Sequence, residues 1–91
     1  MIMLKNDEQM DGIRTSGHYL AEMFEEIGPQ ICAGMSTYDV DKLFHEWMRK
    51  RHFGAPCVGY MGYPAATCVS VNDMVIHGIP TKQEILEDGD I

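Results

Sequence analysis

The stretch CVGYMGYPAATCVSVNDMVIHGIP, residues 57–80, decides the fold class of this 91-residue chain. It contains three short β-prone runs, separated by glycine, proline and an Asn-Asp pair: residues 57–60, 67–71 and 74–77. Pro80 ends the last run, because the residue before a proline is held in extended geometry. We therefore predict short antiparallel strands in this stretch.

A helix is predicted upstream of these strands. Residues spaced alternately by three and four lie on one stripe of it: Met10, Ile13, Gly17, Leu20, Phe24, Ile27 and Ile31. Asn6 and Gln9 form a capping-box pair at its start. Pro29 removes one backbone donor and crowds the preceding turn, so we expect the helix to kink or to stop close to Gly28.

A second helix is predicted after residue 35. Ser36 or Thr37 can cap it, Asp39 and Asp41 stand in its first turn, and the basic residues 49–51 crowd its C-terminal end. We expect about four turns. Its core residues have helical spacing: Val40, Leu43, Phe44, Trp47 and Met48.

Two helices followed by short antiparallel strands place the chain in the α/β class, of the α+β kind. The turn signal at Asp88-Gly89 is followed only by Asp90 and Ile91. Because so few elements make a thin core, we expect residues 1–91 to form the first part of a larger single domain, or to need a partner.

Charge and composition limit the partners and the cellular location that we expect. Fourteen Asp and Glu against seven Lys and Arg give a net charge of −7, which disfavours nucleic acid and anionic membranes as partners. No apolar run reaches the roughly 18–20 residues of a membrane-spanning helix, and the first eight residues lack a signal-peptide layout. Three cysteines cannot all pair within the chain, so we expect reduced thiols and a cytoplasmic location.

The candidate chemistry lies in residues 57–80. Cys57, Tyr60, Tyr63 and Cys68 could line a small apolar pocket with sulfur atoms and aromatic faces, or could serve ordinary core and turn packing. His77 follows a predicted strand and could face a site or be a hydrogen-bonded structural histidine. Two other possibilities stay open.

One is a thiol hydrolase, with Cys57 or Cys68 as nucleophile and His77 as base. The other is a metal site, although the separations of the ligand types are irregular and no acidic cluster is nearby. Its candidate ligands would be His45, His52, Cys57, Cys68 and His77.

Several short motifs together resemble one known family. They are GMST at 34–37, GYMGYP at 59–64, CVSVN at 68–72, HGIP at 77–80 and DGDI at 88–91. The chain resembles the N-terminal half of a bacterial type I methionine aminopeptidase. This resemblance implies the pita-bread fold and a cytoplasmic metallo-aminopeptidase that removes the initiator methionine from nascent proteins. It also implies, as partners, the ribosome or a complementary C-terminal half.

The resemblance also implies roles for single residues. His77 matches a histidine that contacts the substrate near the scissile peptide. Cys57, Tyr60, Tyr63 and Cys68 match the pocket for the methionine side chain. The backbone carbonyls of Asn72 and Met74 match positions that help to hold a monovalent cation in some members.

Two departures from the family pattern stand out. Met61 occupies a position where members usually carry a second histidine, and a thioether cannot share a proton. The resemblance also implies two divalent ions (cobalt, manganese, iron or zinc) held by two Asp, one His and two Glu, which would fall after Ile91. We therefore expect that the chain alone binds no divalent ion and is inactive. It would be either part of an enzyme or a remnant that binds nascent N-termini or a partner protein.

Overall fold

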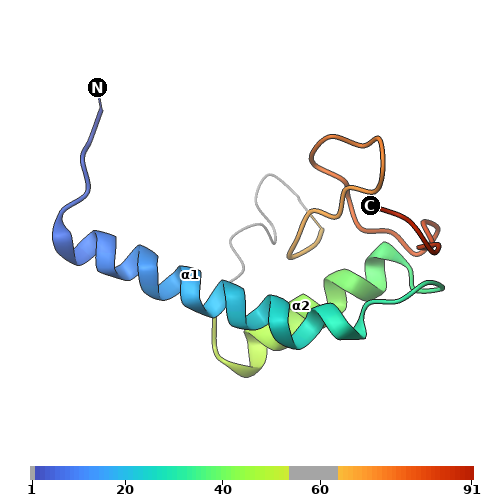
Figure 1. Cartoon of the computed structure of the whole chain (residues 1–91), viewed down its shortest axis with the longest axis horizontal. Coiled ribbons are helices and arrows are strands. Elements are labelled where there is room, and N and C mark those ends of the chain that lie inside the picture. The colour runs from blue at the N-terminus through green and yellow to red at the C-terminus, as the bar shows by residue number, and fades with distance from the viewer. Residues whose placement is uncertain (1, 54–63) are drawn as a thin grey trace.

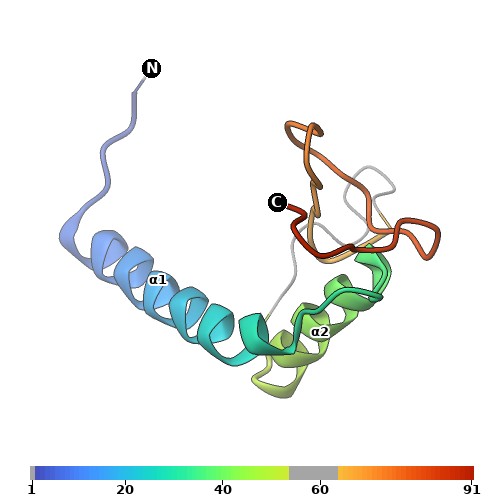
Figure 2. The ribbon, with the colours of Figure 1, turned by 45° about the vertical axis from the view of Figure 1, so that its right-hand side comes forward.

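The structure, a computed structural model, describes residues 2–53 and 64–91. It contains a long helix, α1 (Asp7–Ile27), a short 3-10 turn, η1 (Gly28–Gln30), and a second helix, α2 (Thr37–Lys50). Helix α2 lies beside the C-terminal part of α1, and residues 64–91 return over α2 (Figures 1 and 2). The first turns of α1 and the tail before them project away from everything else in both views.

Helix α1 begins as its sequence predicts. The Asn6 side-chain oxygen accepts a hydrogen bond from the Gln9 backbone N–H at 2.8 Å, and the Gln9 side chain accepts one from the Asn6 N–H at 2.9 Å. These two bonds satisfy two N–H groups that the helix geometry leaves without partners. The capping-box prediction is confirmed.

The predicted break at Pro29 is also confirmed. Helix α1 ends at Ile27, and Pro29 stands in the short turn η1 that follows. Proline has no N–H to donate and fits the first turn of a helix, so it is tolerated where η1 starts but would interrupt α1. Residues 31–36 then reverse the chain into α2.

Helix α2 is capped by Ser36. Its side chain accepts a bond from the Asp39 N–H at 3.0 Å, and the Asp39 carboxylate accepts one from the Ser36 N–H at 3.0 Å. Arg49 and Lys50 occupy the last turn, where cations offset the negative end of the helix dipole. The start, the end and the length of the predicted second helix are confirmed.

The hydrophobic core sits where the two helices cross. Its buried residues are Met23, Ile27, Val40, Phe44 and Trp47, with Ile31, Met35, Leu43, Met48, Val69 and Leu86 packed around them. The predicted core face of α2 is therefore confirmed. The predicted stripe of α1 is helical, but in this chain only its C-terminal end reaches the core.

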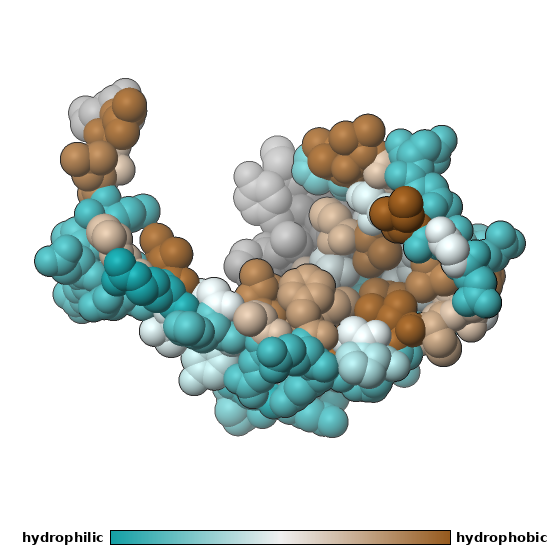
Figure 3. Space-filling model, viewed as in Figure 1, coloured by the Kyte–Doolittle hydropathy of each residue, from teal (hydrophilic) through white to brown (hydrophobic). Residues whose placement is uncertain are grey.

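We call Met10, Ile13, Gly17, Leu20 and Phe24 the α1 stripe. Its four side chains larger than glycine are 40% to 58% exposed. Figure 3 shows hydrophobic atoms along the edge of α1 that faces the side of residues 64–91, and hydrophilic atoms along the opposite edge.

The predicted strands are wrong for the described residues. Residues 64–91 contain no strand, and the only β-type pairing in the described ranges is an isolated antiparallel bridge between Ser36 and Ile85. Asn72 and His77 adopt positive φ angles of 55° and 57°, which turn the chain out of an extended path. The predicted run 57–60 lies outside the described residues.

Among the helices of the described residues, none is long and apolar enough to cross a membrane.

Candidate functional site

The predicted site residues fall into two sets. Cys57, Tyr60 and Tyr63 lie outside the residues that the structure describes. Met61, which departs from the family pattern, lies outside them too. Cys68, Asn72, Met74 and His77 are described, and all four are exposed. They lie in one segment, residues 67–78, which leaves the surface of α2 and returns to it (Figure 1).

A backbone hydrogen bond closes this segment. The Val69 N–H donates to the Gly78 carbonyl at 2.9 Å, and the Gly78 N–H donates to the Ser70 hydroxyl at 3.1 Å. Cys68 and His77 are the chain neighbours of the two residues that this bond joins. The structure therefore brings these two predicted residues to one end of the segment.

Gly78 is required at this closure. A Cβ atom at position 78 would lie 2.1 Å from the Val69 carbonyl oxygen, a distance that no side chain can accept. Because that oxygen belongs to the backbone, relief would need the two chain segments to separate. The glycine of the HGIP motif therefore allows His77 to stand next to the point where the segment closes.

The far end of the segment is a tight turn at Asn72. The Met74 N–H donates to the Val71 carbonyl at 3.2 Å. Asn72 tolerates its positive φ angle better than most residues, because its side chain can compensate with local hydrogen bonds. The turn orients the backbone of Asn72 and Met74, the two positions matched to a monovalent cation site, and that role stays a prediction.

Asn72 also fastens this turn to residues 87–91; we call these contacts the Asn72–Asp90 clasp. Its amide group donates to the Asp90 carboxylate at 3.0 Å and accepts from the Ile91 N–H at 3.0 Å, while its own N–H donates to the Ile91 carbonyl at 2.7 Å. The Asp90 carboxylate also accepts from the Glu87 N–H at 2.9 Å. The bonds from Asn72 and Glu87 lower the pKa of the Asp90 carboxyl below its ordinary value of 3.8.

Asp41 of α2 anchors the start of the segment. One of its carboxylate oxygens accepts bonds from the Ala66 N–H at 3.1 Å, the Thr67 N–H at 2.8 Å and the Thr67 hydroxyl at 2.7 Å. Asp41 is buried, and a buried carboxylate is stable only when donors surround it. These bonds fix the backbone just before Cys68.

A second anchor holds the chain after His77. The Thr37 hydroxyl donates to the Thr81 carbonyl at 3.1 Å and accepts from the Thr81 N–H at 2.8 Å. The Thr37 N–H donates to the Glu84 carbonyl at 2.9 Å. Thr37 is fully buried, so water cannot compete for these bonds. The N-terminal part of α2 thus holds both ends of the segment that carries Cys68 and His77.

Sequence reasoning missed these anchoring roles. It assigned Asp41 to the first turn of a helix and Thr37 to a cap, whereas Ser36 and Asp39 form the cap. The sequence does contain a pattern that could have predicted the role of Asp41. Asp41 precedes Phe44 by three residues and Met48 by seven, so it shares their helix face. A carboxylate on an apolar face predicts a buried hydrogen-bond acceptor.

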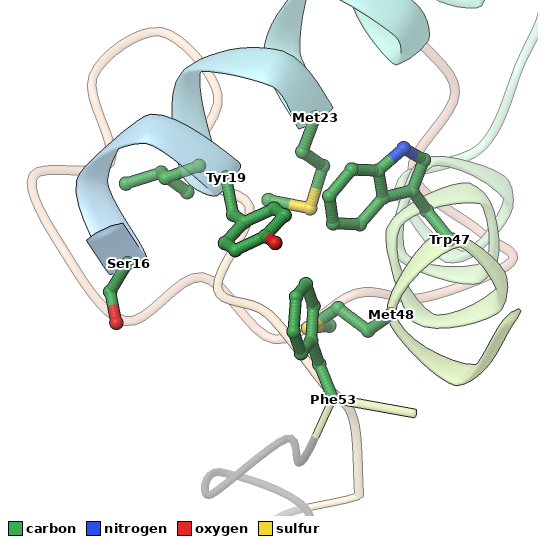
Figure 4. Close-up of a pocket in the computed structure, with 7 residues that line it drawn as sticks. Ser16, Tyr19, Met23, Trp47, Met48 and Phe53 are labelled. Atoms are coloured by element: carbon green, nitrogen blue, oxygen red, sulfur yellow. The ribbon is translucent and has the colours of Figure 1, made fainter. Parts of the chain in front are cut away.

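Two cavities border these elements. One, of about 380 Å³, lies beside the clasp, between residues 31–33, residues 69–71 and residues 86–91. The other, of about 290 Å³, lies between the helices, where sulfur atoms and aromatic rings converge (Figure 4). Its lining residues are Ser16, Tyr19, Leu20, Met23, Trp47, Met48 and Phe53. This second cavity has the sulfur and aromatic lining expected of the methionine pocket, but Cys68, the one predicted pocket residue that the structure describes, does not line it.

The described residues do not fit a metal centre. Within residues 2–53 and 64–91, no group of three or more His, Cys, Asp or Glu side chains is placed to hold a metal ion. The five candidate ligands noted from sequence include Cys57, which lies outside those ranges. We therefore derive no chemical step through a metal from this chain.

The chain is similar to known methionine aminopeptidases along nearly its whole length. It is 37% identical over 91 residues to the methionine aminopeptidase of Escherichia coli strain K12, a match that covers 99% of this chain and 34% of that protein. The Buchnera aphidicola (Schizaphis graminum) protein of the same name is 37% identical over 89 residues. The chain thus spans about a third of the length of the curated relatives it matches. The resemblance noted from sequence had implied about half.

Solved structures agree with this similarity. The fold matches the methionine aminopeptidase of Rickettsia prowazekii with a TM-score of 0.89 at 27% identity, and that of Thermotoga maritima with a TM-score of 0.85 at 34% identity. Each match covers 99% of this chain and 36% of the other. The two-helix arrangement and the path of residues 64–91 are therefore a known part of a larger fold, although residues 64–91 form no strand here.

A model of one protein family matches most of the chain. The model of metallopeptidase family M24 matches residues 11–91, which include α1 from its second turn, α2 and the whole segment that bears Cys68 and His77. The chain belongs to metallopeptidase family M24.

Proposed function

We propose that this chain supplies the methionine-binding side of a methionine aminopeptidase, the hydrolase that removes the initiator methionine from nascent proteins in the cytoplasm. The observation that carries the proposal is the similarity to methionine aminopeptidases over 99% of the chain, in sequence and in fold. The remaining two thirds of such an enzyme would supply the ligands of two divalent ions, which the described residues of this chain lack.

The residues of the chain would bind and orient the substrate. Cys57, Tyr60, Tyr63 and Cys68 would surround the methionine side chain, since sulfur and aromatic groups favour contact with a thioether. His77 would hydrogen-bond the substrate beside the peptide bond that is cut. The anchors at Asp41 and Thr37 support this role, because they hold both ends of the segment that carries Cys68 and His77.

A chimeric enzyme tests the proposal. The 91 residues of this chain would replace the matched 91 residues of the Escherichia coli methionine aminopeptidase, and methionine release from a Met-Ala-Ser peptide would be followed with Co²⁺ or Mn²⁺. We expect release that falls by roughly 10²-fold or more when His77 is changed to Ala, in line with the loss of one hydrogen-bond donor at a reacting centre. The matched control is His18→Ala, a change at an exposed position of α1.

Two results would contradict the proposal. A folded chimera that binds metal but releases no methionine would show that this chain cannot complete the enzyme. Equal activity in the His77→Ala and His18→Ala variants would remove His77 from the site. A variant Met61→His should raise the activity of the chimera if the missing second histidine limits it.

A second candidate function is binding without catalysis, favoured by Met61 in the position of a proton-sharing histidine. In that case the chain binds an N-terminal methionine, or a partner protein, and does not hydrolyse the peptide bond. Fluorescence anisotropy of a labelled Met-initiated peptide, recorded with EDTA, tests it. We expect binding that Tyr63→Lys or Cys68→Lys weakens, with Asp73→Lys as the control for added charge. Absence of binding by the folded chain would exclude this function.

A further inference from the structure

His77 stands in a backbone conformation that residues with a side chain rarely adopt. Its φ angle is 57°, and among the described residues other than glycine only His52 and Asn72 share the left-handed region. His52 follows the C-terminal end of α2, where helices commonly end in this conformation, and asparagine tolerates it. His77 follows no helix. A residue in this region stays there when the surrounding structure holds it, and such residues gather at functional sites.

The next residue, Gly78, is held at both of its backbone polar groups. Its N–H donates to the Ser70 hydroxyl at 3.1 Å, and its carbonyl accepts from the Val69 N–H at 2.9 Å. Gly78 is buried, so water does not readily replace a partner that is lost. The chain after His77 is therefore fixed against residues 69 and 70.

The bond to Ser70 acts directly on the conformation of His77. The Gly78 N–H belongs to the planar peptide group that joins His77 to Gly78, so its direction changes when the chain rotates about the ψ angle of His77. An acceptor for this N–H resists that rotation. Within residues 2–53 and 64–91, no other hydrogen bond reaches this peptide group, because the Gly78 carbonyl belongs to the next one.

We propose that Ser70 is a positioning residue for His77: its hydroxyl fixes the peptide group after His77 and thereby the place of the imidazole. The backbone sets the direction of the Cα–Cβ bond, so a rotation at His77 would move the whole ring. At a reacting centre a shift of about 1 Å can cost about 10²-fold in rate. This role rests on the proposed function, which places His77 beside the peptide bond that is cut.

Kinetics of the chimeric enzyme test this role. Ser70→Ala removes the acceptor, and we expect kcat for methionine release to fall about tenfold while KM changes less than about twofold. Ser70→Thr keeps a hydroxyl and should restore most of kcat. The matched control is Thr15→Ala, which removes a hydroxyl that donates to the Asp11 carbonyl at 3.0 Å in α1 and should leave both constants unchanged.

A double-mutant cycle separates positioning from general support of the fold. If Ser70 acts through His77, Ser70→Ala should lower kcat about tenfold in the chimera and less than about twofold in its His77→Ala variant. A serine that only stabilises the fold would cost the same factor in both. If Ser70→Ala does not fold, Ser70→Cys takes its place, because a thiol of similar size is a weak acceptor.

Hydrogen exchange gives a readout that does not depend on activity. In the 91-residue chain the Gly78 amide should exchange about tenfold faster in the Ser70→Ala variant than in the wild type, because it has lost its acceptor. The Thr15→Ala variant should leave this rate unchanged. An equal rate in the Ser70→Ala and wild-type chains would show that the hydroxyl does not hold the peptide group.

The role of Ser70 and the proposed function fail in different ways. An active chimera in which Ser70→Ala leaves kcat unchanged, or lowers it equally with and without His77, would overturn only the role of Ser70. A folded, metal-loaded chimera that releases no methionine would overturn the proposed function, and the role of Ser70 in catalysis with it. Loss of activity in His77→Ala but not in Ser70→Ala would leave the proposed function standing.

Discussion

The two ends of α1 share one sequence pattern and have different surroundings. Its C-terminal turns contribute Met23 and Ile27 to the core, whereas its N-terminal turns, with Met10 and Ile13, project into solvent. Capping and periodicity suffice to define a helix at both ends, but burial requires a neighbour. The difference teaches that one apolar pattern can be buried at one end of a helix and exposed at the other.

The packed end is also held by polar contacts. Glu26 accepts hydrogen bonds from the Trp47 indole N–H and from the Arg51 guanidinium, which lies 4.0 Å from the centre of the Trp47 ring. These groups tie α1 to the C-terminal end of α2. The projecting end has a local ion pair, between Arg14 and Asp11 at 2.8 Å. Substitutions should therefore act globally at the packed end and locally at the projecting end.

The largest expected effect is at the packed end. Trp47→Ala removes a buried ring and its contact with Glu26, so it should lower the free energy of unfolding by about 3–5 kcal/mol. Ile13→Ala on the projecting end should change it by less than about 0.5 kcal/mol. Urea unfolding followed by circular dichroism measures both. Similar losses in the two variants would mean that the projecting end is packed in solution.

The anchor at Asp41 should give the next largest effect. Asp41→Ala leaves the N–H groups of Ala66 and Thr67 without their acceptor, at a cost of about 2–3 kcal/mol. Hydrogen exchange at these two amides should speed up more than exchange within α1. Asp73→Ala, at an exposed position in the turn, is the control. An unchanged exchange rate at Thr67 would show that Asp41 does not anchor the segment.

The two capping boxes provide a matched comparison. Ser36→Ala and Asn6→Ala each remove one cap, worth about 1 kcal/mol. At α2 the loss should appear in the global free energy of unfolding. At α1 it should appear only as faster hydrogen exchange in the first turns, with an unchanged urea midpoint. A shift of the midpoint by Asn6→Ala would contradict the division of α1 into a packed end and a projecting end.

The smallest expected effect concerns pH. The folded pKa of Asp90 is lowered by its bonds to Asn72 and Glu87, so the clasp contributes stability that is fully present above the ordinary pKa of 3.8 and is lost as the pH falls through the folded pKa. Asn72→Ala should raise the pKa of Asp90 toward 3.8. A carboxyl titration by NMR measures both values, and an unchanged pKa would mean that the clasp is open in solution.

Much of the helical framework could be predicted from sequence. Asn6 with Gln9, Pro29 and the serine before α2 are local signals, and each acts within a few residues of its own position. The prediction of strands at 67–71 and 74–77 was wrong, because β-propensity describes how a residue fits a sheet and not whether neighbouring strands are present. Among the described residues the two runs are joined by the turn bond from the Met74 N–H to the Val71 carbonyl, and Val69 bonds to Gly78 just beyond the second run, which makes no strand.

The candidate site was predicted in part. The sequence pointed to Cys68 and His77, and the structure brings them to one end of a closed segment; Cys57, Tyr60 and Tyr63 lie outside the described residues. The anchors were not predictable in the same way. Thr37 and Thr81 are 44 positions apart, and Asp41 is 25 and 26 positions from its two donors, so no local pattern joins them.

The sequence by itself determined the helices, their caps, the break at Pro29 and the family, because these depend on local hydrogen bonding, side-chain spacing and short motifs. Only the tertiary structure decided which apolar residues are buried, that Asp41 and Thr37 hold the segment with Cys68 and His77, and that the α1 stripe is bare. The physical reason is that burial and long-range hydrogen bonds depend on which surfaces meet, and one apolar stripe can face a core, a partner or water without any change in its sequence.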